Sequence, residues 1–187
     1  MKQEKKRTLL MESAMHIVAR DGLENTTTKS IGANAGLNEV YIYRNFKDKE
    51  DLIRQTFLHE DSTFIREIIN RLPVLAVEDM NWEMRCRILW ENCWNYMMQR
   101  REESLFYVRY YYSASFDADV QKEHKYYCEE LAEEWTRIGA GNLSETVLLY
   151  MIEMIWNYSA KVALGIWEND PETSEQCFQY LYALLQK

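Results

Sequence analysis

The chain has few of the residues that interrupt or cross-link a fold. Its 187 residues include two prolines and six glycines, and the intervals between them are long. A fold of many short strands would need a turn signal about every 8–12 residues, so this scarcity favours helices. With 47% hydrophobic and 13% aromatic residues, the chain can bury a core and is not expected to be disordered.

Cysteines are also few, and they do not group. Cys86, Cys93, Cys128 and Cys177 form no CxxC pair and no Cys/His cluster with zinc spacing. The first residues are charged and lack the apolar segment of a secretory signal. We therefore expect reduced thiols, a cytoplasmic protein and no metal or other cofactor.

Signatures of a membrane span or of an enzyme are lacking too. The most apolar segment, 147–167, contains Glu153 and Lys161. Charged residues are unfavourable inside a bilayer-spanning helix, so we do not expect this segment to cross a membrane. His59-Glu60 has no second histidine at metalloprotease spacing. Because a nucleophile elbow, a phosphate-binding glycine loop and a dinucleotide fingerprint are all missing, we expect a non-enzymatic protein with no catalytic residues.

Positive charge is scarce overall, but it is unevenly distributed. The formal net charge is −8, from 22 Lys and Arg against 30 Asp and Glu. Residues 1–54 hold ten basic against eight acidic residues, and the remainder holds twelve against twenty-two. This asymmetry is compatible with a nucleic-acid-facing N-terminal part on an acidic body.

Hydrophobic spacing and capping residues predict an all-α fold of about nine helices. N-caps are expected at Thr27 or Thr28, at Asn38, at Asp48 and at Asp170, which precedes Pro171. The predicted helices cover residues 3–20, 28–34, 39–45, 49–71, 81–101, 103–113, 117–138, 144–168 and 171–187, with a loop at 74–80.

The second and third of these helices are short and are joined by a turn that contains Gly36, as in a helix-turn-helix. If Ile42 and Phe46 point into the core, the helical period turns most of the intervening polar and aromatic residues outward. The second helix of such a pair enters the major groove of DNA. The pattern therefore indicates a DNA-reading element.

The run TTTKSIGANAGLNEVYIYRNFKDKEDL resembles the N-terminal DNA-binding signature of TetR-family transcriptional regulators. Departures from that signature occur at Gly32 (usually alanine), Asn38 (Ser/Thr), Val40 (glycine), Tyr41 (a small hydroxyl residue) and Asn45 (His or Tyr). Glycine in place of alanine at position 32 is expected to destabilise the predicted helix 28–34 by about 0.5–1 kcal/mol. The matching positions are Thr27, Thr28, Ile31, Ala35, Gly36, Leu37, Ile42, Tyr43, Phe46, Lys49, Glu50 and Leu52.

The resemblance implies a DNA-binding domain at 1–48 and a ligand-binding and dimerisation domain at 49–187, linked by the helix 49–71. It implies phosphate contacts from Thr28, Tyr41 and Lys49. The cap Asn38 also belongs to the predicted DNA-binding set. The remaining members have side chains that suit base edges or groove walls: Lys29, Glu39, Val40, Tyr43 and Asn45. The alternative is that Glu39, Arg44 and Asn45 form an ordinary solvated face and that Tyr43 packs partly in the core.

The last two helices are apolar over much of their circumference, so they must be covered on several sides. In the resembled family such helices form a four-helix dimer interface, which would favour a near-palindromic DNA operator. The alternative is a monomeric core. The predicted interface consists of Leu148, Ile152, Ile155, Phe178, Leu181 and Leu185.

The middle of the chain is rich in aromatic residues, and the resemblance implies that these helices enclose an effector pocket. The predicted pocket consists of Trp90, Trp94, Tyr107, Tyr111, Glu153 and Trp156, although core packing would account for most of these residues. Aromatic walls beside a carboxylate suit a small apolar or cationic aromatic molecule. The predicted function is a homodimeric repressor released from its operator by such a molecule. The alternative is a small-molecule-binding protein with a vestigial DNA head.

Overall fold

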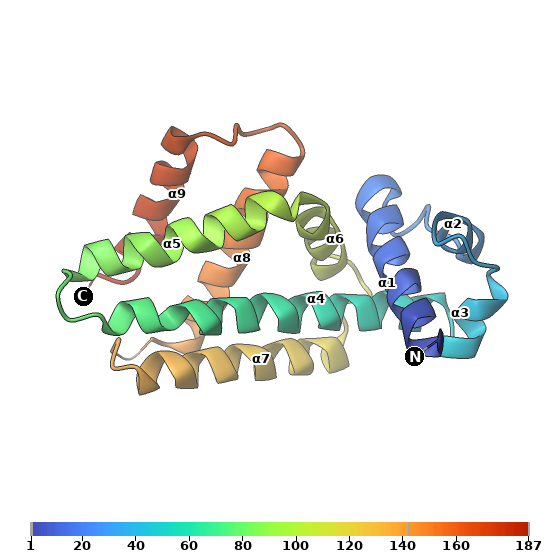
Figure 1. Cartoon of the computed structure of the whole chain (residues 1–187), viewed down its shortest axis with the longest axis horizontal. Helices are drawn as coiled ribbons and strands as arrows, with labels where there is room; N and C mark the ends of the chain where they lie inside the picture. The colour runs from blue at the N-terminus through green and yellow to red at the C-terminus, as the bar shows by residue number, and fades with distance from the viewer. Residues whose placement is uncertain (1, 142, 187) are drawn as a thin grey trace. The chain divides into compact units, whose positions relative to one another are not determined.

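The computed structural model describes residues 2–141 and 143–186, which form nine α-helices and one 3₁₀ helix and contain no strand (Figure 1). The all-helical prediction is confirmed. No helix in these residues combines the length and apolarity needed to cross a bilayer. The helices are α1 (Lys2–Asp21), α2 (Thr28–Asn34), α3 (Val40–Asn45), α4 (Lys49–Arg71), η1 (Leu72–Ala76), α5 (Trp82–Gln99), α6 (Arg101–Tyr111), α7 (Ala118–Arg137), α8 (Glu145–Ala163) and α9 (Pro171–Ala183).

Three of the predicted caps act as expected. The Thr27 side chain accepts a hydrogen bond from the Ser30 N–H at 3.0 Å at the start of α2. At the start of α4, Asp48 Oδ1 accepts from the Asp51 N–H at 2.7 Å. Asp170 Oδ1 accepts from the Thr173 N–H at 2.7 Å, with Pro171 at the first position of α9. These bonds satisfy N–H groups that the helices themselves leave without acceptors.

Several element boundaries differ from the prediction, and two of these differences have a clear physical cause. Helix α8 ends at Ala163, five residues early, because Gly165 adopts φ 67° and the Ile166 N–H donates to the Lys161 carbonyl at 2.9 Å. That bond is the long one of a Schellman motif, which closes a helix at a glycine. The predicted loop at 74–80 was wrong for its first residues, because Leu75 is buried within η1.

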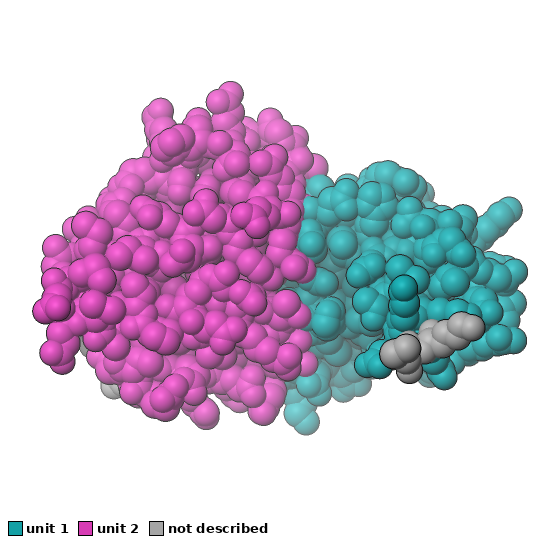
Figure 2. Space-filling model, in the orientation of Figure 1, with its two compact units in different colours: residues 1–61, 102–123 teal, residues 62–101, 124–187 magenta. Residues whose placement is uncertain are grey.

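The chain divides into two compact units, shown in different colours in Figure 2. Unit 1 comprises residues 1–61 and 102–123, and unit 2 comprises residues 62–101 and 124–187. The chain passes between the units inside α4, after the first residue of α6 and inside α7, so each crossing lies within a helix. Unit 1 is larger than the predicted DNA-binding domain of 1–48, whose boundary remains a prediction about function.

Aromatic rings hold unit 1 together. Phe57 of α4 has no exposed surface, and its ring centroid lies 4.8 Å from that of Tyr107 and 4.6 Å from that of Tyr110, both on α6. The Phe116 ring packs against it edge-on at 5.6 Å. The Tyr107 hydroxyl donates to the buried Asp61 carboxylate at 3.0 Å. Most of α6 therefore belongs to the same core as the N-terminal helices.

Candidate nucleic-acid interface

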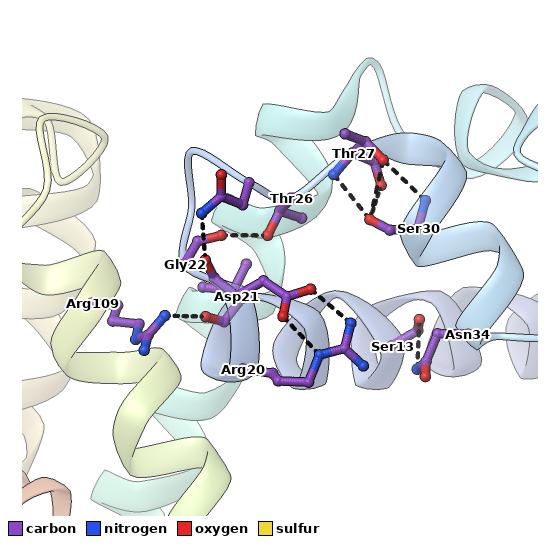
Figure 3. Close-up of polar contacts among 11 residues, drawn as sticks. Ser13, Arg20, Asp21, Gly22, Thr26, Thr27, Ser30, Asn34 and Arg109 are labelled. Atoms are coloured by element: carbon purple, nitrogen blue, oxygen red, sulfur yellow. Dashed lines mark hydrogen bonds and ion pairs between the residues drawn. The ribbon is translucent and has the colours of Figure 1, made fainter. Parts of the chain in front are cut away.

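Side-chain hydrogen bonds fasten α2 to α1 (Figure 3). The Ser13 hydroxyl, 3% exposed, donates to the Ile31 carbonyl at 2.7 Å. It also accepts from the Asn34 amide at 3.0 Å, the contact that Figure 3 shows. Arg109 of α6 donates to the Val18 carbonyl in the last turn of α1 at 3.1 Å. Buried polar groups are thus paired, and the first two helices form a rigid base for the third.

A tight turn connects α2 to α3. Gly36 adopts φ 63°, the left-handed conformation that glycine takes without steric cost. Asn38 follows, with its Oδ1 accepting from the Val40 N–H at 2.9 Å and its carbonyl accepting from the Tyr41 N–H at 3.0 Å. Glu39 occupies the N-cap position and α3 begins at Val40, so the predicted start was one residue early.

Helix α3 has one buried face and one exposed face. Ile42 has no exposed surface and Phe46, directly after the helix, is 5% exposed. Tyr43 is 60% exposed and Val40 is 49% exposed. Contact with water does not stabilise large apolar side chains, so two of them exposed on one short helix are unusual. The exposed face of α3 is available for contact with another molecule.

The other predicted DNA-binding residues surround this face. Lys29, Asn38 and Glu39 are exposed, whereas Thr28, Tyr41, Asn45 and Lys49 are half-buried. The structure brings two of them into direct contact, because the Thr28 hydroxyl donates to Glu39 Oε2 at 3.1 Å. The Glu39 carboxylate therefore lies beside the hydroxyl that the resemblance assigns to phosphate, where it would repel a phosphate group.

Two predicted residues already have partners within the chain. The Asn45 amide donates to the Tyr41 carbonyl at 2.6 Å, so bidentate pairing with adenine would require that bond to break. The Lys49 ammonium donates to the Thr26 carbonyl at 3.0 Å and lies 3.4 Å from Glu50. Both side chains support the helix-turn-helix, and their contacts with DNA remain predictions.

Basic side chains from α1 and α3 meet over Tyr41. The Lys6 ammonium lies 3.7 Å from the centroid of the Tyr41 ring, and the Arg44 guanidinium lies 5.2 Å from it. With Gln3 and Asn45, these residues line a cleft of about 430 Å³. The predicted DNA-binding set did not contain Gln3, Lys6 or Arg44. Sequence spacing cannot reveal this cluster, because Lys6 and Tyr41 meet only through tertiary packing.

Asp51 closes the turn between α3 and α4 by accepting from the Lys47 N–H at 2.9 Å and from the Gln55 amide at 2.7 Å. Burial raises the pKa of Asp51, but these hydrogen bonds and the nearby Arg54 and Arg7 outweigh it and hold the pKa below its usual value. The ionised carboxylate therefore stabilises the turn above about pH 4. This contribution disappears as the pH falls through the lowered pKa.

Comparison with known proteins identifies this N-terminal arrangement. Residues 10–56, which contain the whole helix-turn-helix, match the sequence profile described as bacterial regulatory proteins, tetR family. This segment of the chain is therefore similar to the DNA-binding domain of TetR-family regulators. Over 44 residues it is 39% identical to YvkB, an uncharacterised HTH-type transcriptional regulator of Bacillus subtilis (strain 168). That match covers 24% of this chain and 23% of the relative, so sequence similarity extends over about a quarter of either protein.

The TetR-type fold extends over the whole chain. A TetR family transcription regulator from Marinobacter aquaeolei VT8 superposes with a TM-score of 0.76 over 98% of both chains, at 19% identity. The TetR-family regulator HI0893 from Haemophilus influenzae RD gives a TM-score of 0.68 over 100% of both chains, at 18% identity. At these identities the similarity concerns the fold alone.

The residues predicted to line an effector pocket are divided between the two units. Trp90 and Trp94 are neighbours on α5 in unit 2, with ring centroids 5.3 Å apart. Trp90 donates its indole N–H to the Ser174 carbonyl at 3.1 Å. Tyr107 and Tyr111 stack at 5.9 Å, but they belong to unit 1.

The two remaining pocket residues lie on α8. Trp156 is 2% exposed and its ring centroid lies 4.6 Å from that of Phe64, which is core packing. Glu153 is half-buried, and neither residue lines the apolar cavity of unit 2. Within the described residues, no three His, Cys, Asp or Glu side chains are grouped as metal ligands would be.

Unit 2 contains a partly open apolar cavity of about 70 Å³, which would have to widen to admit an aromatic ring. Burial raises the pKa of the Cys86 and Cys93 thiols in its wall to about 12, so both are neutral near pH 7. No charged side chain takes part in the lining, which consists of Ile68, Cys86, Leu89, Trp90, Cys93, Leu131, Trp135, Leu148, Met151, Ile152, Ile155, Phe178, Leu181, Tyr182 and Leu185.

All six residues predicted for the dimer interface line this cavity. Leu148, Ile152, Phe178 and Leu181 are at most 4% exposed in the single chain, and Ile155 and Leu185 are half-buried. Four of the six side chains thus have little surface left for a partner, and their part in a dimer interface remains a prediction. Other residues of α8, α9 and their connection remain exposed instead: Tyr150, Leu164, Ile166, Tyr180 and Leu184.

Proposed function

We propose that the protein is a dimeric transcriptional repressor that reads a near-palindromic DNA operator with α3 and is released by a small apolar effector. The observation that carries the proposal is the exposed face of α3. There Val40 and Tyr43 stand free of the core beside Glu39, within a sequence that matches the TetR family. An exposed second helix of a helix-turn-helix is the element that enters the major groove.

Local charge supports DNA binding despite the net charge of −8. Lys6 and Arg44 lie at Tyr41, and the exposed Lys29 lies on α2. These cations are few, so few counterions would be released when DNA binds. The acidic remainder of the chain would oppose sequence-independent association, and affinity should therefore depend only modestly on salt.

We expect the purified protein to retard a duplex that carries its own upstream region, with two protomers bound per site. Unrelated duplex of the same length should bind far more weakly, and the log–log slope of affinity against salt should be about −5, as three phosphate contacts from each of two protomers predict. A fluorescence anisotropy titration at several salt concentrations measures both. Equal affinity for both duplexes, or no binding, would contradict the proposal and favour a small-molecule-binding protein with a vestigial head.

Dimerisation would use the apolar surface that the single chain leaves uncovered. Tyr150 and Tyr180 are 55% and 65% exposed on α8 and α9, and Leu184 follows α9 at 37%. Burying such side chains is the main favourable term in protein association. A dimer through this surface would present two α3 helices to two half-sites.

The effector class follows from the cavity of unit 2. Its wall is apolar and its two thiols are un-ionised, so a cation placed there would lose its hydration without gaining an opposite charge. A neutral ring or chain would exchange water for van der Waals contacts. Of the two predicted ligand classes, the cavity favours the apolar one.

Toluene and benzylamine have nearly the same size but differ in charge at neutral pH. At about ten times its dissociation constant, toluene should stabilise the fold by about 1.4 kcal/mol, which raises the melting temperature by roughly 3–6 °C. Benzylamine should leave the melting temperature unchanged. Differential scanning fluorimetry measures both shifts.

Filling the cavity provides the control for this prediction. Ile155→Phe should abolish the response to toluene, because the added ring occupies the space that the ligand needs. Tyr150→Phe, on the exposed face of the same helix, should respond like the unmodified protein. Equal stabilisation by both compounds, or a toluene shift that survives in Ile155→Phe, would place the ligand elsewhere.

A further inference from the structure

Helix α3 is too short to hold its own orientation. It contains six residues, and Glu39 at its N-cap makes no side-chain capping hydrogen bond. Isolated helices shorter than about 12–15 residues are marginal in water because nucleation is costly. The angle at which α3 presents Tyr43 must therefore come from the residues that contact its two ends.

At its start, α3 lies against Gly32 of α2. A Cβ atom on Gly32 would stand 2.9 Å from the Leu37 carbonyl oxygen, 3.1 Å from the Glu39 nitrogen and 3.3 Å from the Glu39 Cα. All three are backbone atoms, which cannot swing aside as the end of a flexible side chain can. The Gly32 carbonyl also accepts from the Leu37 N–H at 2.9 Å. Gly32 therefore permits an approach that alanine would not.

At its end, α3 is held by Arg7 of α1. The Arg7 guanidinium donates to the Asn45 carbonyl at 3.3 Å, bonds to the Gln55 side chain of α4, and lies 4.6 Å from the centroid of the Phe46 ring. The Asn45 carbonyl is at the C-terminus of the helix, where carbonyl groups lack partners and a cation is favourable. One planar side chain thus ties three helices together.

We infer that Gly32 and Arg7 are positioning residues for DNA recognition, a role that rests on the proposed function. Neither needs to contact DNA. Gly32 sets how closely the first turn of α3 approaches α2, and Arg7 sets where its last turn lies relative to α1 and α4. Together they fix the angle at which Glu39 and Tyr43 meet the base edges, so they act on sequence discrimination more than on general affinity.

Gly32→Ala tests the first contact. Alanine favours a helix over glycine, so propensity alone predicts unchanged or improved behaviour. We expect instead that affinity for the upstream duplex falls about tenfold or more while affinity for unrelated duplex changes less than about twofold, as loss of aligned base contacts predicts. Ala33→Ser, which adds one heavy atom at the exposed neighbouring position, should bind like the unmodified protein. Unaltered discrimination in Gly32→Ala would overturn the role of Gly32.

Arg7→Lys and Arg7→Gln test the second contact, with circular dichroism to verify folding. Lysine keeps the charge but cannot bond to Asn45 and Gln55 together as the guanidinium does. Both variants should therefore lose the preference for the upstream duplex over unrelated duplex, while the slope of affinity against salt stays unchanged. Gln55→Leu removes one Arg7 partner, together with the hydrogen bond from Gln55 to Asp51, and should lose part of the discrimination between the two duplexes. If Arg7→Lys binds normally and Arg7→Gln makes the slope shallower by about 1.8, which is one lost phosphate contact in each of two protomers, Arg7 is a phosphate contact and the inference fails. Failure of the unmodified protein to discriminate would refute the proposed function itself.

Discussion

Tyr43→Ala should lower affinity for the operator about tenfold or more, as the loss of a major-groove contact does, and leave the melting temperature unchanged. Tyr43 is 60% exposed, so its ring contributes little to the folded chain and much to any surface that α3 meets. Surface substitutions of this kind change stability by about 0.5 kcal/mol or less. Anisotropy titration and differential scanning fluorimetry measure the two quantities on the same sample.

Two further tyrosine variants make this result interpretable. Tyr43→Phe removes only the hydroxyl, so a loss as large as that of alanine would assign the contact to a hydrogen bond, and a small loss would assign it to the ring. Tyr112→Ala removes another exposed tyrosine of unit 1, 61% exposed, and should bind DNA normally. If Tyr43→Ala also binds normally, α3 does not read the operator.

Phe57→Ala should destabilise the protein by about 3–5 kcal/mol. The Phe57 ring has no exposed surface and contacts the rings of Tyr107, Tyr110 and Phe116, so alanine would leave a cavity that several rigid rings cannot fill. In a chain of this size the loss corresponds to a fall in melting temperature of roughly 6–20 °C. Calorimetry measures it directly.

Phe57→Leu retains much of the buried volume and should lose markedly less stability than alanine. The exposed Val40→Ala provides a second reference, since it removes apolar surface that the fold does not bury. A loss below about 1 kcal/mol in Phe57→Ala, within the range of surface substitutions, would mean that the ring cluster does not hold unit 1 together.

Local signals in the sequence determined most of the elements. Thr27, Asp48 and Asp170 were predicted as caps, and each accepts a backbone hydrogen bond at the start of its helix. The buried positions of Ile42 and Phe46 and the exposed position of Tyr43 follow from helical period. Capping and periodicity depend on residues within one or two turns of each other, so the sequence displays them directly.

Arrangements that join distant segments were not predictable in this way. Lys6 with Tyr41, Arg7 with Asn45, and Phe57 with Tyr107 each connect residues more than thirty positions apart. The expectation that Gly32 loosens α2 rested on helix propensity alone, which takes no account of the Leu37 and Glu39 backbone that lies against it. Tyr107 and Tyr111 were grouped with Trp90, yet α6 packs into the other unit.

The amino-acid sequence alone determined the all-helical class, the helix-turn-helix and the face that α3 exposes, because hydrogen bonds and periodicity over a few residues specify them. Tertiary structure alone decided which stripe of α8 is covered. That helix is apolar over most of its surface, so its pattern allowed Leu148 and Ile152 to face either a partner or the interior. Packing within unit 2 places them around the cavity and leaves Tyr150 outside.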